Sequence, residues 1–275
     1  MDDSVSPSEA PTPAAAHEGS LAALTTFVAG VADAVAPVSL GHFRHPLSIE
    51  HKADESPVTI ADREVESAIR ALIAHQYPDH GILGEEEGGA PTTEGPLWVI
   101  DPIDGTRSFI AGIPLYGTLI AFLVDGRPRI GMIDMPALKE RWMGAADRPT
   151  TFNDRPCRTS DCRDLAAARL AATSIDLFEV ADRERFDALT RAVWQRQFGG
   201  DCYLYGALAS GGLDLVVESN LKPYDFCALA PVVAGAGGVM TDWQGRPLTV
   251  ASDGRVLAAA TPDLHAQALA YLSSD

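Results

Sequence analysis

Apolar residues in the N-terminal third of the chain recur every three or four positions, which is the period of an amphipathic helix. One set occupies residues 21–35 and ends at Pro37, which predicts a helix that stops there because proline cannot donate the next backbone hydrogen bond. A second helix is predicted to begin near Thr59, with Asp62 placed as in a capping box, and to end before Pro78. Its predicted apolar face consists of Val65, Ile69, Leu72 and Ile73.

Beyond Gly89 the pattern changes to short apolar runs of strand length. A run at 116–124 is followed by Asp125 and Gly126, which form a strong hairpin signal. Similar runs occupy 97–100, 129–133 and 142–145. The polar stretch at 50–57 is expected to be a mobile loop. The first half is therefore predicted to place two helices against an antiparallel sheet.

The second half alternates between strands and helices. Apolar runs at 168–172, 213–217, 238–242 and 256–260 are interleaved with helical stretches at 183–195, 203–211, 225–236 and 263–272. Such alternation favours an α/β arrangement. Residues 1–18 are rich in Pro, Ala, Ser and Glu and are expected to be a disordered tail. We predict an α+β part over 19–150 and an α/β part over 151–275, which share one continuous body.

Charge and composition narrow the classes of function. The formal charge of −17 argues against a nucleic-acid-binding surface, which needs clustered Lys and Arg. The apolar stretches look too short to span a bilayer and the acidic start is unlike a secretory signal, so we expect a cytoplasmic protein without a membrane partner. The four cysteines do not show the spacing typical of a zinc site. If so acidic a protein binds an anion, a divalent cation is the usual source of positive charge.

Two acidic motifs lie beside residues that break regular structure. The first is the run Gly-Glu-Glu-Glu-Gly-Gly at 84–89, where adjacent carboxylates raise one another's pKa unless a cation neutralises them. An acidic surface turn is the alternative. In the second, Asp225 opens an apolar helix that ends at Gly237, and it is either the N-cap of that helix or a ligand. Pro231 is predicted to kink this helix.

The most informative motif has the order Asp-Pro-Ile-Asp-Gly-Thr. A strand delivers Asp101 to its end, Pro102 cannot extend the ladder, and Gly105 permits a tight reversal. Asp101, Asp104 and the Ile103 carbonyl can then face one point, and oxygen ligands of these kinds suit Mg²⁺. Phosphatases of the haloacid dehalogenase type are an alternative, but their aspartates are spaced D-x-D. Here the two aspartates are three positions apart, which argues against that class.

In order and spacing, the motifs resemble the inositol monophosphatase superfamily of lithium-sensitive, Mg²⁺-dependent phosphatases, over roughly residues 20–272. The resemblance is carried by Gly84-Glu85-Glu86, by Trp98-Val99-Ile100-Asp101-Pro102-Ile103-Asp104-Gly105-Thr106 with Phe109, and by Asp225 before Ala236-Gly237-Gly238. It implies a layered αβαβα sandwich of the inositol monophosphatase/fructose-1,6-bisphosphatase type and a homodimer. It also implies roughly two or three Mg²⁺ ions per site. The implied ligands are Glu85, Asp101, the Ile103 carbonyl, Asp104 and Asp225, with Glu86 supporting them.

The same resemblance implies roles in catalysis and substrate binding. Thr106 and Asp62 would orient and deprotonate the attacking water, and Gly105 with Thr106 would contact the substrate. Lys52 would lie on a loop that closes over the site. No covalent intermediate is needed, because metal ions activate water directly. The predicted function is Mg²⁺-dependent hydrolysis of a small-molecule phosphate monoester.

The choice of substrate depends on fewer residues. The run Gly-Gly-Asp-Cys-Tyr around Asp201, and Tyr224 before Asp225, are similar to the histidinol-phosphate phosphatase branch. Histidinol phosphate carries a cationic amine, for which Asp201 and Glu218 are candidate partners, whereas Asp201 as a helix cap is the alternative. We therefore expect L-histidinol phosphate, an intermediate of histidine biosynthesis, before inositol 1-phosphate. A 3′-phosphoadenosine 5′-phosphate is less favoured, and the complete set of carboxylates argues against a regulatory member without activity.

Overall fold

The computed structural model describes residues 20–46, 49–51 and 57–273. The tail predicted at 1–18 and the position of Lys52 lie outside these residues, so neither expectation is tested. At the edge of the second gap, β1 (Ile49–His51) and β2 (Pro57–Thr59) pair as a short antiparallel ribbon.

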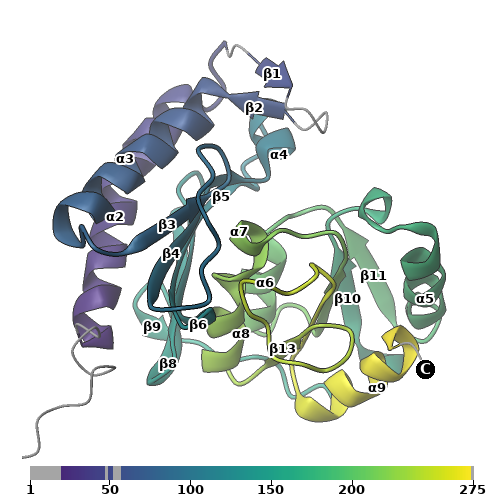
Figure 1. Cartoon of the computed structure of the whole chain (residues 1–275). Helices are drawn as coiled ribbons and strands as arrows, with labels where there is room; N and C mark the ends of the chain where they lie inside the picture. The colour runs from purple at the N-terminus through teal and green to yellow at the C-terminus, as the bar shows by residue number, and fades with distance from the viewer. Residues whose placement is uncertain (1–19, 47–48, 52–56, 274–275) are drawn as a thin grey trace, which may run out of the picture.

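Helices and sheets are stacked as an αβαβα sandwich, as predicted (Figure 1). On the outside of the first sheet lie α2 (Leu21–His42) and α3 (Ile60–Gln76). Between the two sheets lie α6 (Tyr203–Ala209) and α8 (Leu229–Gly235). On the outside of the second sheet lie α5 (Val180–Thr190) and α9 (Pro262–Leu272). Each sheet is thus covered on both faces.

The first sheet has seven strands in chain order, and only β3 and β4 pair in parallel. Its strands are β3 (Gly81–Gly84), β4 (Pro96–Asp104), β5 (Gly117–Val124), β6 (Arg127–Met135), β7 (Glu140–Ala145), β8 (Arg148–Phe152) and β9 (Arg155–Pro156). In β4, Trp98 and Ile100 pack in the cluster that contains α2 and α3, whereas Leu97 and Val99 pack in the cluster between the sheets. Because both faces are buried, the strand is continuously apolar instead of alternating.

The second sheet has five strands in the order β11-β10-β12-β14-β13. They are β10 (Arg169–Ala172), β11 (Gln195–Phe198), β12 (Leu215–Glu218), β13 (Val239–Thr241) and β14 (Val256–Ala259). The helix predicted over 183–195 ends at Thr190, and β11 was not predicted because it is an exposed, largely polar edge strand. The first sheet ends at Pro156 and the second begins at Arg169, while the division of the chain near residue 150 stays a prediction.

Three expectations for the first helices were wrong. Helix α2 continues through Pro37 to His42, because its buried face continues to Ser39 and packing on α3 outweighs one lost hydrogen bond. With 22 residues and a mean hydropathy of 1.7, α2 is also long and apolar enough to cross a membrane by length and composition, contrary to our expectation. Its buried side chains, among them Val28 and Val35, instead belong to the core shared with α3. In α3, Leu72 was predicted to lie on the apolar face but is exposed, whereas Val65, Ile69 and Ile73 are buried.

The helix predicted over 225–236 is two helices, α7 (Pro223–Phe226) and α8. Asp225 is therefore the third residue of α7 and not its N-cap, a position that Lys222 occupies. Pro231 lies in the first turn of α8, four residues after Cys227, at which α7 ends, so the interruption falls where the missing Pro231 N–H would have bonded. The kink itself stays a prediction. Two short 3₁₀ helices, η1 (Leu165–Ala167) and η2 (Ile175–Leu177), complete the second half.

Candidate active site

Strand β4 carries the first two carboxylates of the site. The strand does not stop at Asp101 as predicted but continues to Asp104, with an irregular register against β5 between these residues. Pro102 has no N–H for the ladder, and its carbonyl instead accepts a hydrogen bond from Thr118 Oγ1 at 2.9 Å. The Ile103 N–H turns back to Asp101 Oδ1 at 3.1 Å. The irregularity therefore lets Asp101 and Asp104 face the same side.

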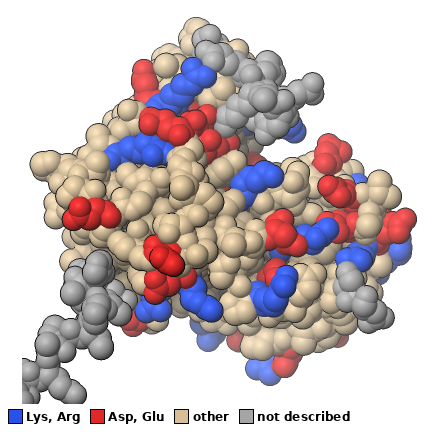
Figure 2. Space-filling model, viewed as in Figure 1, with Lys and Arg blue, Asp and Glu red and all other residues tan. Residues whose placement is uncertain are grey.

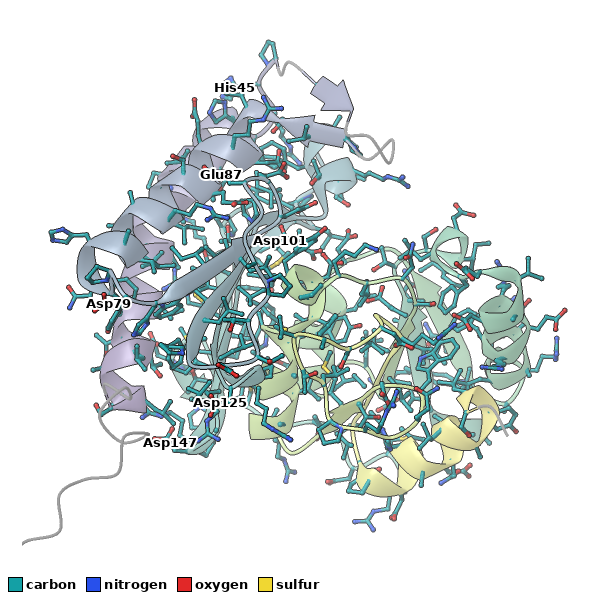
Figure 3. All side chains as sticks on the ribbon, viewed as in Figure 1. His45, Asp79, Glu87, Asp101, Asp125 and Asp147 are labelled. Atoms are coloured by element: carbon teal, nitrogen blue, oxygen red, sulfur yellow. The ribbon has the colours of Figure 1, made fainter. Side chains whose placement is uncertain are left out.

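A cluster of three carboxylates forms where α7 meets β4. One oxygen from each of Asp101, Asp104 and Asp225 lies within 4.8 Å of the others. Asp101 is buried and the other two are partly buried. Backbone donors hold two of them, because the N–H of Cys202 donates to Asp104 Oδ2 at 2.6 Å and that of Lys222 donates to Asp225 Oδ2 at 2.6 Å. Figure 3 shows Asp101 on the ribbon of β4, at the side that faces the second sheet.

Burial and mutual repulsion make this cluster costly to ionise. Burial raises the pKa of Asp101 well above its usual value, and the negative charges of Glu85 and Asp104 raise it further. Burial also raises the pKa of Asp225, to about 7, although the Lys222 N–H opposes the shift. A hard cation held by oxygen ligands removes this cost, so the donor set fits Mg²⁺.

The acidic turn that contains Glu85 and Glu86 is held by α3. The buried carboxylate of Glu66 accepts hydrogen bonds from the N–H groups of Glu86 at 2.7 Å and Glu87 at 3.1 Å. Position 84 requires glycine, because a Cβ there would lie 2.0 Å from Glu66 Oε1. Glu66 was missed by sequence reasoning. It shares the apolar face of α3 with Ile69, and a charged residue at such a position was an available signal.

Thr106 and Asp62 form the pair that was predicted to handle the nucleophile. Asp62 is buried, and its Oδ2 accepts hydrogen bonds from Thr59 N–H at 2.8 Å and Thr59 Oγ1 at 2.6 Å, which confirms the capping box. Its other oxygen, Oδ1, lies 3.2 Å from Thr106 Oγ1. That hydroxyl also lies 3.0 Å from the Ile103 carbonyl. Burial raises the pKa of Asp62, which the hydrogen bonds from Thr59 and Thr106 oppose.

A left-handed turn brings Asp201 to the same site. Gly199, Gly200 and Asp201 all have positive φ, at 86°, 132° and 47°. Asp201 does not cap α6, whose N-cap is Cys202, and its Oδ2 instead lies 3.4 Å from Ser108 Oγ. Gly105, with φ of 85°, is required opposite this turn because a Cβ there would lie 3.0 Å from Asp201 Oδ2. Burial and the charge of Glu218 raise the pKa of Asp201 to about 6.

Glu218 is buried at the end of β12. Its Oε1 accepts a hydrogen bond from Thr173 N–H at 2.9 Å and its Oε2 accepts one from Tyr205 OH at 2.7 Å. Burial nevertheless raises its pKa. Tyr205 and Thr173 were not identified from the sequence, because nothing local to them signals a carboxylate partner.

These residues surround one cavity of about 400 Å³. Its lining includes predicted site residues from both halves of the chain: Glu85, Asp104, Gly105, Thr106, Asp201, Glu218 and Asp225. Arg107 and Ser108 complete the wall beside Asp201. Glu86 and Asp62 lie behind this wall, in the turn and the helix just described. Acidic side chains elsewhere are spread over the visible face of the molecule, as expected for a solvated surface (Figure 2).

Comparison with known proteins agrees with this architecture. The model of the inositol monophosphatase family matches residues 20–275. The chain is 45% identical over 251 residues to the chloroplastic bifunctional phosphatase IMPL2 of Arabidopsis thaliana, covering 88% of this chain and 72% of that one. It is 40% identical over 205 residues to a histidinol-phosphatase of Mycobacterium tuberculosis, covering 72% of this chain and 79% of that one.

A solved structure of an inositol monophosphatase from Zymomonas mobilis shares 46% identity with this chain. The two superpose with a TM-score of 0.84 over 93% of this chain and 99% of that one. Fold, motif order and sequence identity therefore agree over nearly the whole length. The chain belongs to the inositol monophosphatase family and is a phosphoric monoester hydrolase.

Proposed function

We propose that this phosphatase hydrolyses L-histidinol phosphate to L-histidinol with Mg²⁺ as its cofactor. The observation that carries the proposal is the presence of Asp201 and Glu218 in the wall of the cavity that also contains Asp104 and Asp225. The similarity to a histidinol-phosphatase at 40% identity supports it.

The charges of the substrate match two different parts of the cavity. The phosphate belongs at the carboxylate cluster, where a cation must neutralise the aspartates before an anion can approach. The amine of histidinol is a cation, and Asp201, with a pKa of about 6, is largely ionised at neutral pH. A cation placed beside Asp201 offsets the cost of burying that charge. An uncharged polyol supplies no such compensation.

The residues of the chain are arranged to receive a proton from water. Bound Mg²⁺ would supply positive charge and lower the pKa of water, and Glu85, Asp101, Asp104, Asp225 and the Ile103 carbonyl would hold it. The Thr106 hydroxyl can accept a hydrogen bond from water while it donates to Asp62 Oδ1, 3.2 Å away. Asp62, which Thr59 holds in place, is then the proton acceptor, and its raised pKa favours that role.

Inositol 1-phosphate is the second candidate. It is favoured by the 46% identity to the Zymomonas mobilis protein, which is an inositol monophosphatase. Carboxylates such as Asp201 also accept hydrogen bonds from hydroxyl groups, so the cavity does not exclude a polyol.

A phosphate-release assay separates the two candidates. The substrates are histidinol phosphate, inositol 1-phosphate and 3′-phosphoadenosine 5′-phosphate, each with and without Mg²⁺ and Li⁺. Asp201→Asn is expected to lower kcat/KM for histidinol phosphate by about 10- to 100-fold, the effect of one lost charge pair, and to affect inositol phosphate much less. Asp176→Asn, which removes an exposed carboxylate outside the cavity lining, is the charge-matched control. Equal losses on both substrates would remove the case for histidinol.

Several further features belong to this proposal. They are the homodimer, the cytoplasmic location without a nucleic-acid or membrane partner, the sensitivity to Li⁺, and the roles of Glu86 and Lys52. The location and the absence of these partners remain predictions from charge and composition, and the others remain predictions from the family resemblance. Inhibition by Li⁺ in the assay above would support one of them directly.

A further inference from the structure

A second cavity, of about 370 Å³, lies outside the active site. Its walls come from the start of β6, the β7–β8 turn and one side of α8, with Met240, Pro247 and Leu248 closing another side. It shares no lining residue with the cavity that contains Asp104 and Asp225. We call it the arginine pocket, after Arg127, Arg129 and Arg148 in its lining.

The charge of the arginine pocket is opposite to that of the protein. The chain has 38 acidic residues against 21 basic ones. The pocket nevertheless gathers Arg127, Arg129 and Arg148, and its lining contains no Asp or Glu. Arg148 pairs with Asp147, an exposed residue whose Oδ1 lies 3.0 Å from Arg148 Nε. The lining itself therefore carries an excess of positive charge, and Asp147 pairs with only one of its three guanidinium groups.

Two of these arginines form no close ion pair in the part of the chain that the structure describes, although the charge of Arg129 helps to lower the pKa of Asp147. Neither Arg127 nor Arg129 has a carboxylate oxygen within 4.0 Å among those residues. Arg129 Nε is in addition buried, and no described group accepts its hydrogen bond. A buried donor without an acceptor costs free energy, and native proteins rarely leave one unsatisfied. An acceptor brought by a ligand would remove this cost.

The chemistry of the pocket indicates the class of that ligand. Guanidinium groups bind phosphate oxygens through paired hydrogen bonds, which favours a ligand with an anionic group such as a phosphate over an uncharged ligand. The remaining walls are mostly apolar and are formed by Pro128, Ala145, Ala230, Pro231, Met240 and Leu248 among others. They suit a flat body with little charge. A cavity of this volume falls in the range of roughly 300–1,000 Å³ that holds small organic ligands.

We propose that the arginine pocket binds a phosphorylated small molecule with a flat ring system, of the mononucleotide class. The phosphate would lie against Arg127 and Arg129, and the ring would lie on the apolar wall formed by α8. This inference does not depend on which phosphate ester the active site hydrolyses.

Titration calorimetry on the metal-free full chain in EDTA tests the proposal. Without metal the active site is a cluster of carboxylates that repels phosphate, so a bound anion reports the arginine pocket. Adenosine monophosphate is expected to bind with a Kd of roughly 10 μM to 1 mM. Inorganic phosphate should bind at least about threefold more weakly because it leaves the apolar wall uncovered, and adenosine should give no measurable binding.

Variants then locate the binding. The double variant Arg127→Gln/Arg129→Gln is expected to raise the Kd for adenosine monophosphate by at least about tenfold. Arg127→Gln alone, at an exposed position, is expected to raise it by about threefold to tenfold. Arg196→Gln, an exposed arginine of β11, is the matched control and should leave binding unchanged. Absence of binding by the wild type, or binding that both pocket variants retain, would overturn the proposal. Equal affinity for phosphate and adenosine monophosphate would refute the mononucleotide assignment.

Discussion

Replacing Asp104 with Asn should stabilise the metal-free protein while it abolishes the response to Mg²⁺. Asp104 presents a carboxylate oxygen within 4.8 Å of those of Asp101 and Asp225. Asparagine has the same shape, and its carbonyl oxygen can still accept the hydrogen bond from Cys202 N–H, which is 2.6 Å long in the wild type. The substitution thus removes a charge from a crowded cluster with little change in packing.

The magnitude follows from the separation of the charges. Two unit charges about 5 Å apart repel by about 3 kcal/mol at an effective dielectric constant of about 20. Asp104 faces two such neighbours, but protons bound to the cluster and surrounding water reduce the repulsion. We expect a net gain of about 1–3 kcal/mol in the free energy of unfolding in EDTA. For a chain of this size that corresponds to a Tm higher by about 3–9 °C.

Thermal unfolding in EDTA and in Mg²⁺ measures both effects. At a concentration about 100-fold above its Kd, Mg²⁺ should stabilise the wild type by about 2.7 kcal/mol, and it should hardly stabilise Asp104→Asn. Asp79→Asn is the control, because Asp79 is exposed, far from the cluster and loses the same charge (Figure 3). The reasoning fails if Asp104→Asn lowers the Tm in EDTA, or if Mg²⁺ stabilises it as much as the wild type. Retained phosphatase activity would also contradict the role given to Asp104.

Three further predictions concern other parts of the molecule. Thr106→Val should lower kcat by about 10²- to 10⁴-fold with little change in KM, because it breaks the link between water and Asp62; an unchanged kcat in a steady-state assay would contradict this role. Asp214→Ala should lower the free energy of unfolding in urea by about 3–5 kcal/mol. The buried Asp214 accepts hydrogen bonds from Arg169 at 2.8 Å, and its removal leaves that guanidinium uncompensated. A loss below about 1 kcal/mol would be evidence against this reasoning. Burial lowers the pKa of His265, so near pH 6.5 the unfolded chain binds a proton that the folded chain does not bind. The free energy of unfolding should therefore fall as the pH drops below about 6.5. In His265→Gln this fall should be flatter, by up to about 1.4 kcal/mol per pH unit, when unfolding is measured from pH 8 to 5.

The sequence predicted those parts of the site that a few neighbouring residues control. The capping box of Thr59 and Asp62 is one example, because both its hydrogen bonds close within one helical turn. The apolar run of β4 and the reversal at Gly105 are others, since strand burial and backbone sterics act locally. The wrong expectations were local too: Pro37 did not end α2, because packing on α3 supplied more free energy than one hydrogen bond.

Tertiary structure decided which distant groups meet. Glu66 holds the acidic turn and Tyr205 holds Glu218, yet neither residue has a sequence pattern that names its partner. The N–H of Cys202 reaches Asp104 only because three residues before it turn left-handed between the two sheets.

What the sequence determined by itself was therefore the chemistry: carboxylates at the ends of a strand and a helix, in an order that matches one family of phosphatases. What only the tertiary structure decided was the distance between these carboxylates and which other side chains contact them. The packing of α7 against β4 brings Asp225 within 4.8 Å of Asp101 and Asp104, and the packing of α8 against β6 leaves Arg129 facing a cavity. Local patterns are set by backbone hydrogen bonding over a few residues. Distances between layers depend instead on how complete side-chain surfaces fit, and this depends on the whole chain at once.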